Sequence, residues 1–338
     1  MLRPFPTLLE FECGNSFRKG RRNNRAGRLV VILLPSLTKH GTLGMKIGFA
    51  FVGAGLAADP DVITLIAQTC EACDYHSLWA PEHIVLLDKY AAKYPYTQDG
   101  VMPFTTTEID LLDPFLALTF AAAATKKIRL GTGICLVPER HPVITAKEVA
   151  TLDKLSRGRF DFGVGIGWMK EEFDALGVPW PKRADRTRDY LAAMKSLWTE
   201  AESSHKGEFC SFDPLRSFPK PVQTPYPPII FGGESEPALK RVAEIGNGWW
   251  GVNVTVEAAK KHIATVKQFA EAAGRDPATL SYAVSPQLGM PVSLDEVKQF
   301  EDLGIDEVIV GAFCGSADEF KQTIEAGAEQ LIVPMAKP

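Results

Sequence analysis

The sequence predicts a (β/α)8 TIM barrel, a closed ring of eight parallel strands surrounded by helices. Eight short apolar runs alternate with helical patterns between residue 45 and the end of the chain. The first run lacks the G-x-G-x-x-G turn that a doubly wound sheet places after its first strand. A chain of 338 residues also suits one large α/β barrel.

Each expected strand is a short apolar run, and each is followed by a helical pattern. The runs cover 45–52, 76–80, 128–135, 159–165, 227–231, 248–252, 281–285 and 307–311. The helical patterns cover 60–75, 114–127, 142–156, 186–200, 235–246, 256–274, 293–304 and 316–330. This order favours a parallel barrel.

Two long insertions interrupt the alternation, one after the second strand and one before the fifth. The first covers 84–113 and is expected to roof the site, because loops that follow barrel strands lie on the catalytic face. The second covers 205–226, follows a helix, and is expected to cross the barrel as a short hairpin.

Residues 1–44 are expected to form a poorly ordered leader outside the domain. Six Lys or Arg residues lie between 18 and 28, and a short apolar run follows them. Met45 then begins a strand directly, like a natural start of the protein. The barrel domain is therefore expected to cover 45–338.

Composition and charge argue against several classes of function. The formal net charge is -4 with acids and bases mixed, which predicts neither a nucleic-acid partner nor a membrane surface. Cys70 and Cys73 form a C-x-x-C inside a helical pattern with no second pair, so no metal site is expected. The cysteine pattern fits a reducing, cytoplasmic compartment.

Candidate catalytic residues follow the second strand. Glu82 and His83 place an acid and an imidazole at the expected mouth, where they can accept and donate protons. The alternative is that both only hydrogen-bond neighbouring loop atoms. Gly131 and Gly133 in the third strand indicate a bulge or a close approach of the backbone to a ligand.

The fourth strand ends in the stretch GRFDFGVGIGW. Its glycines follow a G-x-G-x-G spacing, which is not the dinucleotide fingerprint. Gly165 and Gly167 leave room for a flat ligand, and Trp168 offers it an aromatic plane. Alternatively, Trp168 packs under the next helix.

The fifth strand ends in the best candidate for a phosphate site. Gly232 and Gly233 close the strand, and Ser235 begins a helix. Free backbone amides at a helix start attract phosphate, and a serine there can bind it as well.

Several other chemistries lack their residues. No lysine ends a strand for Schiff-base formation, no three carboxylates end successive strands, and no H-x-H pair ends the first strand. A glycine-lined mouth, a phosphate cradle and one acid–imidazole pair suit a protein that positions a reactive cofactor.

Three segments, 131–168, 171–198 and 219–252, together resemble the bacterial luciferase-like oxidoreductase family, in particular its coenzyme F420-dependent branch. The likeness runs from about residue 45 to about residue 315, and residues 1–44 have no counterpart. The resemblance implies a TIM barrel that holds a flavin or deazaflavin across its strand ends and forms a homodimer.

The resemblance also implies roles for individual residues. It makes His83 and Glu82 catalytic near the reactive ring, and it places a non-prolyl cis peptide at Gly133–Ile134. It assigns cofactor contacts to Gly133, Ile134, Gly165, Gly167, Trp168, Gly232 and Gly233, and the helix start adds Ser235 to this set. Trp168 stands where sugar-phosphate dehydrogenases of the family carry glutamate, which argues against glucose-6-phosphate oxidation.

The expected function is hydride transfer between F420 and a small organic substrate. An alternative is an FMNH2-dependent monooxygenase that uses O2, because both cofactors need a phosphate cradle and an open ring site. A second alternative is a barrel that binds a phosphorylated ligand without catalysis. The sequence does not identify the substrate.

Overall fold

The computed structural model describes residues 45–335, except 98, 103–105 and 288. The leader predicted for residues 1–44 lies outside the described residues. Within the described part, no helix combines the length and the apolar character needed to cross a bilayer.

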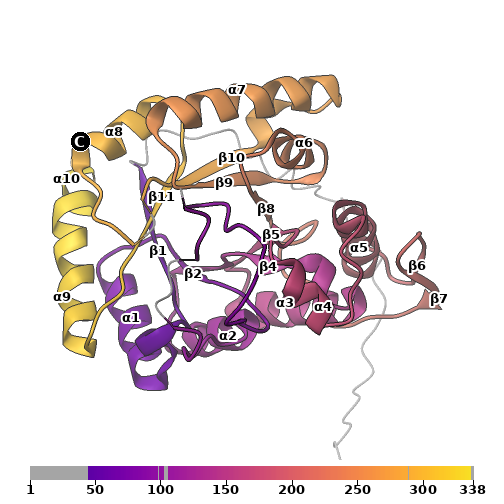
Figure 1. The fold of residues 1–338 in the computed structure, drawn as a ribbon, viewed down its shortest axis with the longest axis horizontal. Helices are drawn as coiled ribbons and strands as arrows, with labels where there is room; N and C mark the ends of the chain where they lie inside the picture. Colours follow the sequence, from indigo (N-terminus) through magenta and orange to yellow (C-terminus); the bar gives the residue numbers. More distant parts are fainter. Residues whose placement is uncertain (1–44, 98, 103–105, 288, 336–338) are drawn as a thin grey trace, which may run out of the picture. The chain divides into compact units, whose positions relative to one another are not determined.

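Parallel strands close into the predicted ring (Figure 1). The sheet order is β3-β2-β1-β11-β10-β9-β8-β5-β4, and pairing of β3 with β5 closes it. The strands are β1 (Lys46–Ala50), β2 (Ser77–Ala80), β3 (Arg129–Thr132), β4 (Cys135–Leu136), β5 (Phe160–Gly165), β8 (Ile229–Gly232), β9 (Gly248–Val252), β10 (Ser281–Ser285) and β11 (Glu307–Gly311). All eight predicted strands are confirmed, and the third is divided into β3 and β4.

Helices surround the ring and follow the predicted order (Figure 1). They are α1 (Pro60–Ala72), α2 (Pro114–Ala124), α3 (Pro142–Ser156), α4 (Lys170–Ala175), α5 (Arg183–Thr199), α6 (Glu236–Ile245), α7 (Val256–Ala272), α8 (Leu294–Asp302), α9 (Ala317–Gly327) and α10 (Val333–Met335). Short 3-10 turns cover Gly55–Ala58, Val137–Glu139 (η2) and Pro277–Thr279, and a π-helical turn covers Ala328–Ile332. Asp59, Asp113, Thr255, Ser293 and Ser316 cap helix starts through their side chains.

An aromatic pair fills the inside of the barrel. The rings of Trp79 and Trp250 lie 4.8 Å apart between centroids, within a buried inner cluster distinct from the core under the helices. A Cβ at Gly131 would lie 2.3 Å from Cε3 of Trp79, and one at Gly133 would lie 2.6 Å from Cζ3 of Trp250. These two glycines therefore make room for tryptophans, where the sequence suggested a bulge or a close approach of the backbone to a ligand.

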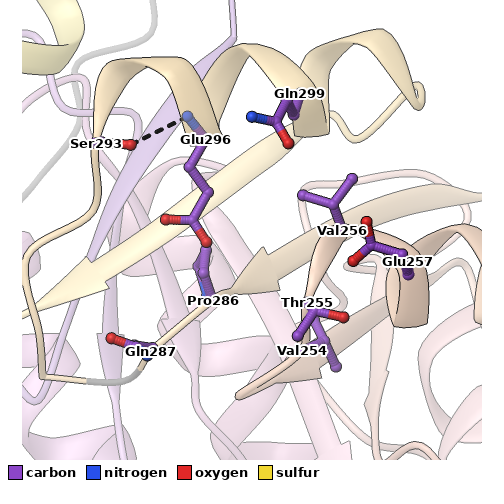
Figure 2. Close-up of a pocket in the computed structure, with 9 residues that line it drawn as sticks. All are labelled: Val254, Thr255, Val256, Glu257, Pro286, Gln287, Ser293, Glu296 and Gln299. Carbon is purple, nitrogen blue, oxygen red and sulfur yellow. Dashed lines mark hydrogen bonds between the residues drawn. The ribbon is translucent and has the colours of Figure 1, made fainter.

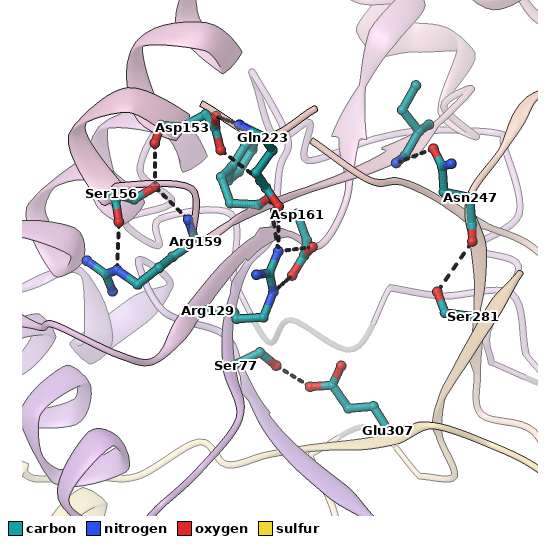
Figure 3. A network of polar contacts seen from close by, with 12 residues as sticks. Ser77, Arg129, Asp153, Ser156, Arg159, Asp161, Gln223, Asn247, Ser281 and Glu307 are labelled. Atoms are coloured by element: carbon teal, nitrogen blue, oxygen red, sulfur yellow. Dashed lines mark hydrogen bonds and ion pairs between the residues drawn. The ribbon is translucent and has the colours of Figure 1, made fainter. Parts of the chain in front are cut away.

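Polar side chains close the end of the barrel where the strands begin (Figure 3). Arg129 in β3 forms two bonds to Asp161 in β5, of 2.5 and 2.6 Å. Glu307 in β11 accepts a hydrogen bond from the Ser77 hydroxyl, which accepts one of 2.7 Å from Trp79 Nε1. Burial raises the pKa of Glu307 to about 7. The network ties the strand starts together and supports Trp79 from below, as expected of the stability face of a barrel.

The insertion before β8 contains the hairpin of β6 (Ser203–Lys206) and β7 (Ser211–Leu215). It lies outside α5 and does not cross the barrel as predicted (Figure 1). Asp189 of α5 is the reason, because its carboxylate binds His205 Nε2 at 2.6 Å and the backbone amides of Phe209 and Cys210 at 2.7 and 2.9 Å.

Candidate active site

The carboxyl ends of β1, β2 and β4 meet at one rim of the barrel. The amide of Val52 donates to the carbonyl of Trp79 at 3.2 Å, and the amide of Gly133 donates to the carbonyl of Ala80 at 2.7 Å. The peptide bond between Gly133 and Ile134 is cis, which confirms the position that the family resemblance implies. Residues that follow these strands therefore share one mouth.

His83 is held at this mouth by a carboxylate that the sequence analysis missed. Glu172, at the start of α4, accepts a hydrogen bond of 2.7 Å from Nδ1 of His83. The other Glu172 oxygen accepts from the amides of Ile84 and Val85 at 2.6 and 3.3 Å, and the side chain is fully buried. Since a carboxylate only accepts, Nδ1 of His83 carries the proton of this hydrogen bond. Among the described residues, Nε2 has no partner, so it is the nitrogen available to a ligand.

Trp168 connects His83 to the first insertion. Its ring meets His83 edge-on at 5.8 Å between centroids, and it meets Tyr90 and Tyr94 at 5.6 and 5.2 Å. Trp168 is therefore half-buried and packs against the insertion. Asn253, after β9, donates to the carbonyl of Tyr96 at 2.7 Å. The insertion thus reaches from the end of β5 to the end of β9, as expected of a roof.

Glu82 lies in a buried ion pair. Its carboxylate binds Nε of Arg140 at 2.7 Å, a second guanidinium nitrogen, and the amide of Leu136 at 2.5 Å. Burial raises the pKa of Glu82 even though Arg140 opposes the shift. These bonds fix the loop that follows β2 to the end of β4. They describe a positioning carboxylate, and the catalytic role predicted for Glu82 stays a prediction.

A second missed acid, Glu139 in η2, lies beside this pair. Both carboxyl oxygens are buried and have no hydrogen-bond partner among the described residues. A Cβ at Gly167 would lie 2.7 Å from one of these oxygens. Burial, together with the nearby charges of Glu172 and Glu82, raises the pKa of Glu139 to about 9. Glu139 is therefore protonated at neutral pH.

Ile134 lies between two bare stretches of backbone. A Cβ at Gly165 would lie 2.4 Å from Cδ1 of Ile134, and a Cβ at Gly232 would lie 2.8 Å from the same atom. The structure thus brings Ile134 and Gly165, predicted to line the ring site, together with Gly232, predicted for the phosphate cradle. Gly167, with φ of 73°, leaves room for Phe173 instead, since a Cβ there would lie 2.5 Å from Cε2 of that ring. The ligand contacts predicted for Gly133 and Gly167 stay predictions.

The predicted phosphate cradle lies where β8 passes into α6. Gly233 has φ of 103°, and its carbonyl accepts from Nε1 of Trp249 at 3.0 Å. Ser235 precedes α6, is exposed, and makes no capping bond with its side chain. A free hydroxyl and the unpaired amides of a helix start fit an anionic group.

Glu234 lies inside this cradle, between Gly233 and Ser235. Its carboxylate accepts from the amide of Val252 at 2.8 Å. Burial raises the pKa of Glu234 to about 7. The cradle therefore gains a negative charge as the pH rises through neutrality.

A separate hollow lies between the starts of α7 and α8 (Figure 2). Its wall includes Thr255, Glu257, Ser293 and Glu296, and the amide of Glu296 donates to the Ser293 hydroxyl at 3.2 Å. It lies by the ends of β9 and β10, across the ring from β2 and β3. None of the predicted site residues lines it.

Comparison with known proteins identifies relatives of this chain. The family model described as luciferase-like monooxygenase matches residues 43–299. An uncharacterised protein of Mycobacterium tuberculosis is 34% identical over 267 residues, which cover 78% of this chain and 92% of that protein. The FMNH2-dependent dimethylsulfone monooxygenase of Pseudomonas putida is 33% identical over 155 residues, which cover 45% of this chain and 42% of that enzyme.

A solved structure shares the fold. The coenzyme F420-dependent tetrahydromethanopterin reductase of Methanopyrus kandleri superposes with a TM-score of 0.68 at 17% identity, covering 86% of this chain and 99% of that one. The compared proteins thus include one described as F420-dependent and one described as FMNH2-dependent.

Proposed function

The chain belongs to the luciferase-like monooxygenase family, and from its site we propose that it is an F420-dependent oxidoreductase acting on a small organic substrate. The observation that carries the proposal is the bond between His83 Nδ1 and Glu172, which leaves Nε2 for a ligand. Ile134, held against Gly165 and Gly232, forms the floor of the same mouth. One imidazole at a ring site suits a reaction in which the cofactor moves a hydride and the protein moves a proton.

His83 supplies the proton chemistry in this proposal. When bound, the deazaflavin supplies or takes the hydride at the substrate carbon. Nε2 of His83 accepts the substrate hydroxyl proton during oxidation, or donates a proton to the carbonyl oxygen during reduction. Glu172 fixes the tautomer and stabilises the charged imidazolium, because its carboxylate faces Nδ1. Trp168 and the first insertion exclude water from this step.

The floor and the cradle fit the two ends of such a cofactor. Ile134 would support the flat ring, because the missing side chains of Gly165 and Gly232 leave room to hold the Ile134 side chain in place. Gly233, Ser235 and the start of α6 would hold the phosphate.

The FMNH2-dependent monooxygenase remains the second candidate. The observation that favours it is the 33% identity to the dimethylsulfone monooxygenase, whose printed name includes that cofactor. Both candidates use the same floor and cradle, so direct binding separates them.

Titration of the purified protein with F420 and with FMN tests the proposal. We expect F420 to quench tryptophan fluorescence saturably at lower concentrations than FMN. We also expect the affinity to fall about threefold from pH 6 to pH 8, because ionised Glu234 opposes the phosphate. Tighter binding of FMN would support the monooxygenase instead.

Glu234→Gln is the matched control for the pH effect. The amide keeps the hydrogen bond from Val252 but carries no charge. We expect its affinity to change little between pH 6 and pH 8. A Gln variant with the same pH dependence as the parent would exclude Glu234 as the cause.

We further propose a cytoplasmic homodimer that pairs through α2 and α3. These helices pack together, and both carry exposed apolar side chains, with Leu116 72% and Ile144 59% exposed. Phe120 and Leu155 lie on the same faces by helical spacing. A helix that is apolar all round, as α2 is, needs cover on its outer side.

Leu116→Asp combined with Phe120→Asp should convert the dimer into a monomer, because charges would be buried in the interface. Light scattering coupled to size-exclusion chromatography measures the mass. Val333→Asp changes an exposed apolar residue of α10 and should leave the dimer intact. A parent protein that is monomeric at micromolar concentration would contradict the proposal.

A further inference from the structure

An aromatic stack forms part of the mouth beside the proposed ring site. Phe51 follows β1 and Phe313 follows β11, and their rings lie 4.3 Å apart between centroids at 32°. The two strands end in register, with Ala50 paired to Gly311, so the stack begins just beyond the paired ends. Phe313 is 55% exposed.

The stack extends the apolar interior of the barrel toward the mouth. Phe51 packs against the inner cluster of Trp79 and Trp250, and Ile134 packs against the same cluster. Phe51 also follows a strand that pairs with β2, from which His83 extends. Phe51 and Ile134 therefore border one apolar surface at the mouth. His83 follows β2, which is the neighbour of β1 in the sheet.

The loops around the stack carry almost no charge. Residues 51–58, 286–292 and 312–316, which follow β1, β10 and β11, contain no Asp, Glu, Lys or Arg. Met290 of the second loop is 55% exposed. A Cβ at Gly289 would lie 3.2 Å from the Phe313 ring, which places this loop against the stack. These three loops themselves therefore carry no counterion for a charged substrate.

We propose that the Phe51–Phe313 stack binds the apolar part of the substrate, and that the substrate class is uncharged carbonyl compounds or alcohols with an aromatic or aliphatic body. The proposal deepens the proposed function and rests on it, because the reacting carbon must lie between this stack and His83. Aromatic side chains recognise such bodies by stacking and by burial of apolar area. A carboxylate on the same body would lose its hydration here without a partner.

A pair of matched probes tests the substrate class. Acetophenone and 4-acetylbenzoate share the carbonyl and the ring, and only the second carries a charge. Calorimetric titration of the F420-loaded protein should give acetophenone a dissociation constant about tenfold or more below that of 4-acetylbenzoate. Equal or tighter binding of 4-acetylbenzoate would overturn the proposal.

Variants of Phe313 test whether acetophenone binds at the Phe51–Phe313 stack. Phe313→Ser should weaken acetophenone binding about five- to tenfold and leave the affinity for F420 unchanged. Phe313→Lys should improve 4-acetylbenzoate relative to acetophenone, because it adds the missing counterion. Phe218→Ser is the control, since Phe218 is 58% exposed in the second insertion. Unchanged acetophenone binding in both Phe313 variants would overturn the assignment.

The same titrations without cofactor keep the two proposals apart. If neither F420 nor FMN binds the parent protein, the proposed function fails. Phe313-dependent binding of acetophenone to that protein would still support the apolar site. Cofactor binding together with Phe313-independent acetophenone binding would overturn the apolar site alone.

Discussion

His83→Ala should lower turnover by about 10²- to 10⁴-fold and leave the dissociation constant of the cofactor nearly unchanged. The variant removes the only imidazole that we place at the ring site, while the floor at Ile134 and the cradle at Ser235 remain. Steady-state rates with the carbonyl acceptor that the parent reduces fastest, together with cofactor titration, measure both quantities.

Glu172→Gln is the matched variant for this prediction. The amide keeps the volume of the side chain, but it cannot neutralise an imidazolium at His83. We expect a smaller loss of turnover than in His83→Ala, again with little change in cofactor affinity. Full activity in His83→Ala would refute the proton role. A parent that binds ligand without any turnover would favour the non-catalytic barrel.

Arg140→Ala should lower the free energy of unfolding by about 3–5 kcal/mol, because it leaves Glu82 buried without its cation. The guanidinium binds Glu82, Asp113 and Glu148 from three separate segments of the chain. Its loss removes the main influence that lowers the pKa of Glu82, which burial already raises. Urea denaturation at fixed pH measures the change.

The loss of stability in Arg140→Ala should depend on pH in a definite direction. A folded-state pKa above the unfolded value means that stability is lost as the pH rises through the folded pKa. The destabilisation in Arg140→Ala should therefore be greater at pH 8 than at pH 6. Glu82→Gln combined with Arg140→Ala removes the buried charge and should recover part of the stability with little pH dependence. An equal loss at both pH values in Arg140→Ala would contradict the mechanism.

Periodicity was sufficient to predict the architecture. Each apolar run became a strand, because the short runs are rich in β-branched and aromatic residues and the segments between them have helical spacing. The family resemblance located the cis peptide at Gly133–Ile134. The hairpin at 203–215 was misplaced because its anchor is Asp189, whose role depends on a tertiary contact that spacing does not reveal.

The candidate site was predicted less completely than the fold. Glu172 lies 89 residues from His83 in sequence, and no local pattern links the two. The sequence analysis missed Glu139 because an arginine follows it directly in the sequence. Only the folded structure shows that its carboxyl oxygens are buried without a hydrogen-bond partner among the described residues. Gly131 and Gly133 were interpreted as a bulge or a close approach to a ligand. The side chains that need their space, Trp79 and Trp250, come from two other strands, which spacing does not reveal.

The packed interior of the barrel has a consequence for the kinetics. Trp79 and Trp250 lie in the buried interior of the barrel, and the polar network at Glu307 lies at the far end. We therefore expect cofactor and substrate to enter and leave at the end of the barrel where His83 lies. Under the proposed arrangement the cofactor lies deeper than the substrate, so an ordered sequence follows in which the cofactor is first to arrive and last to leave.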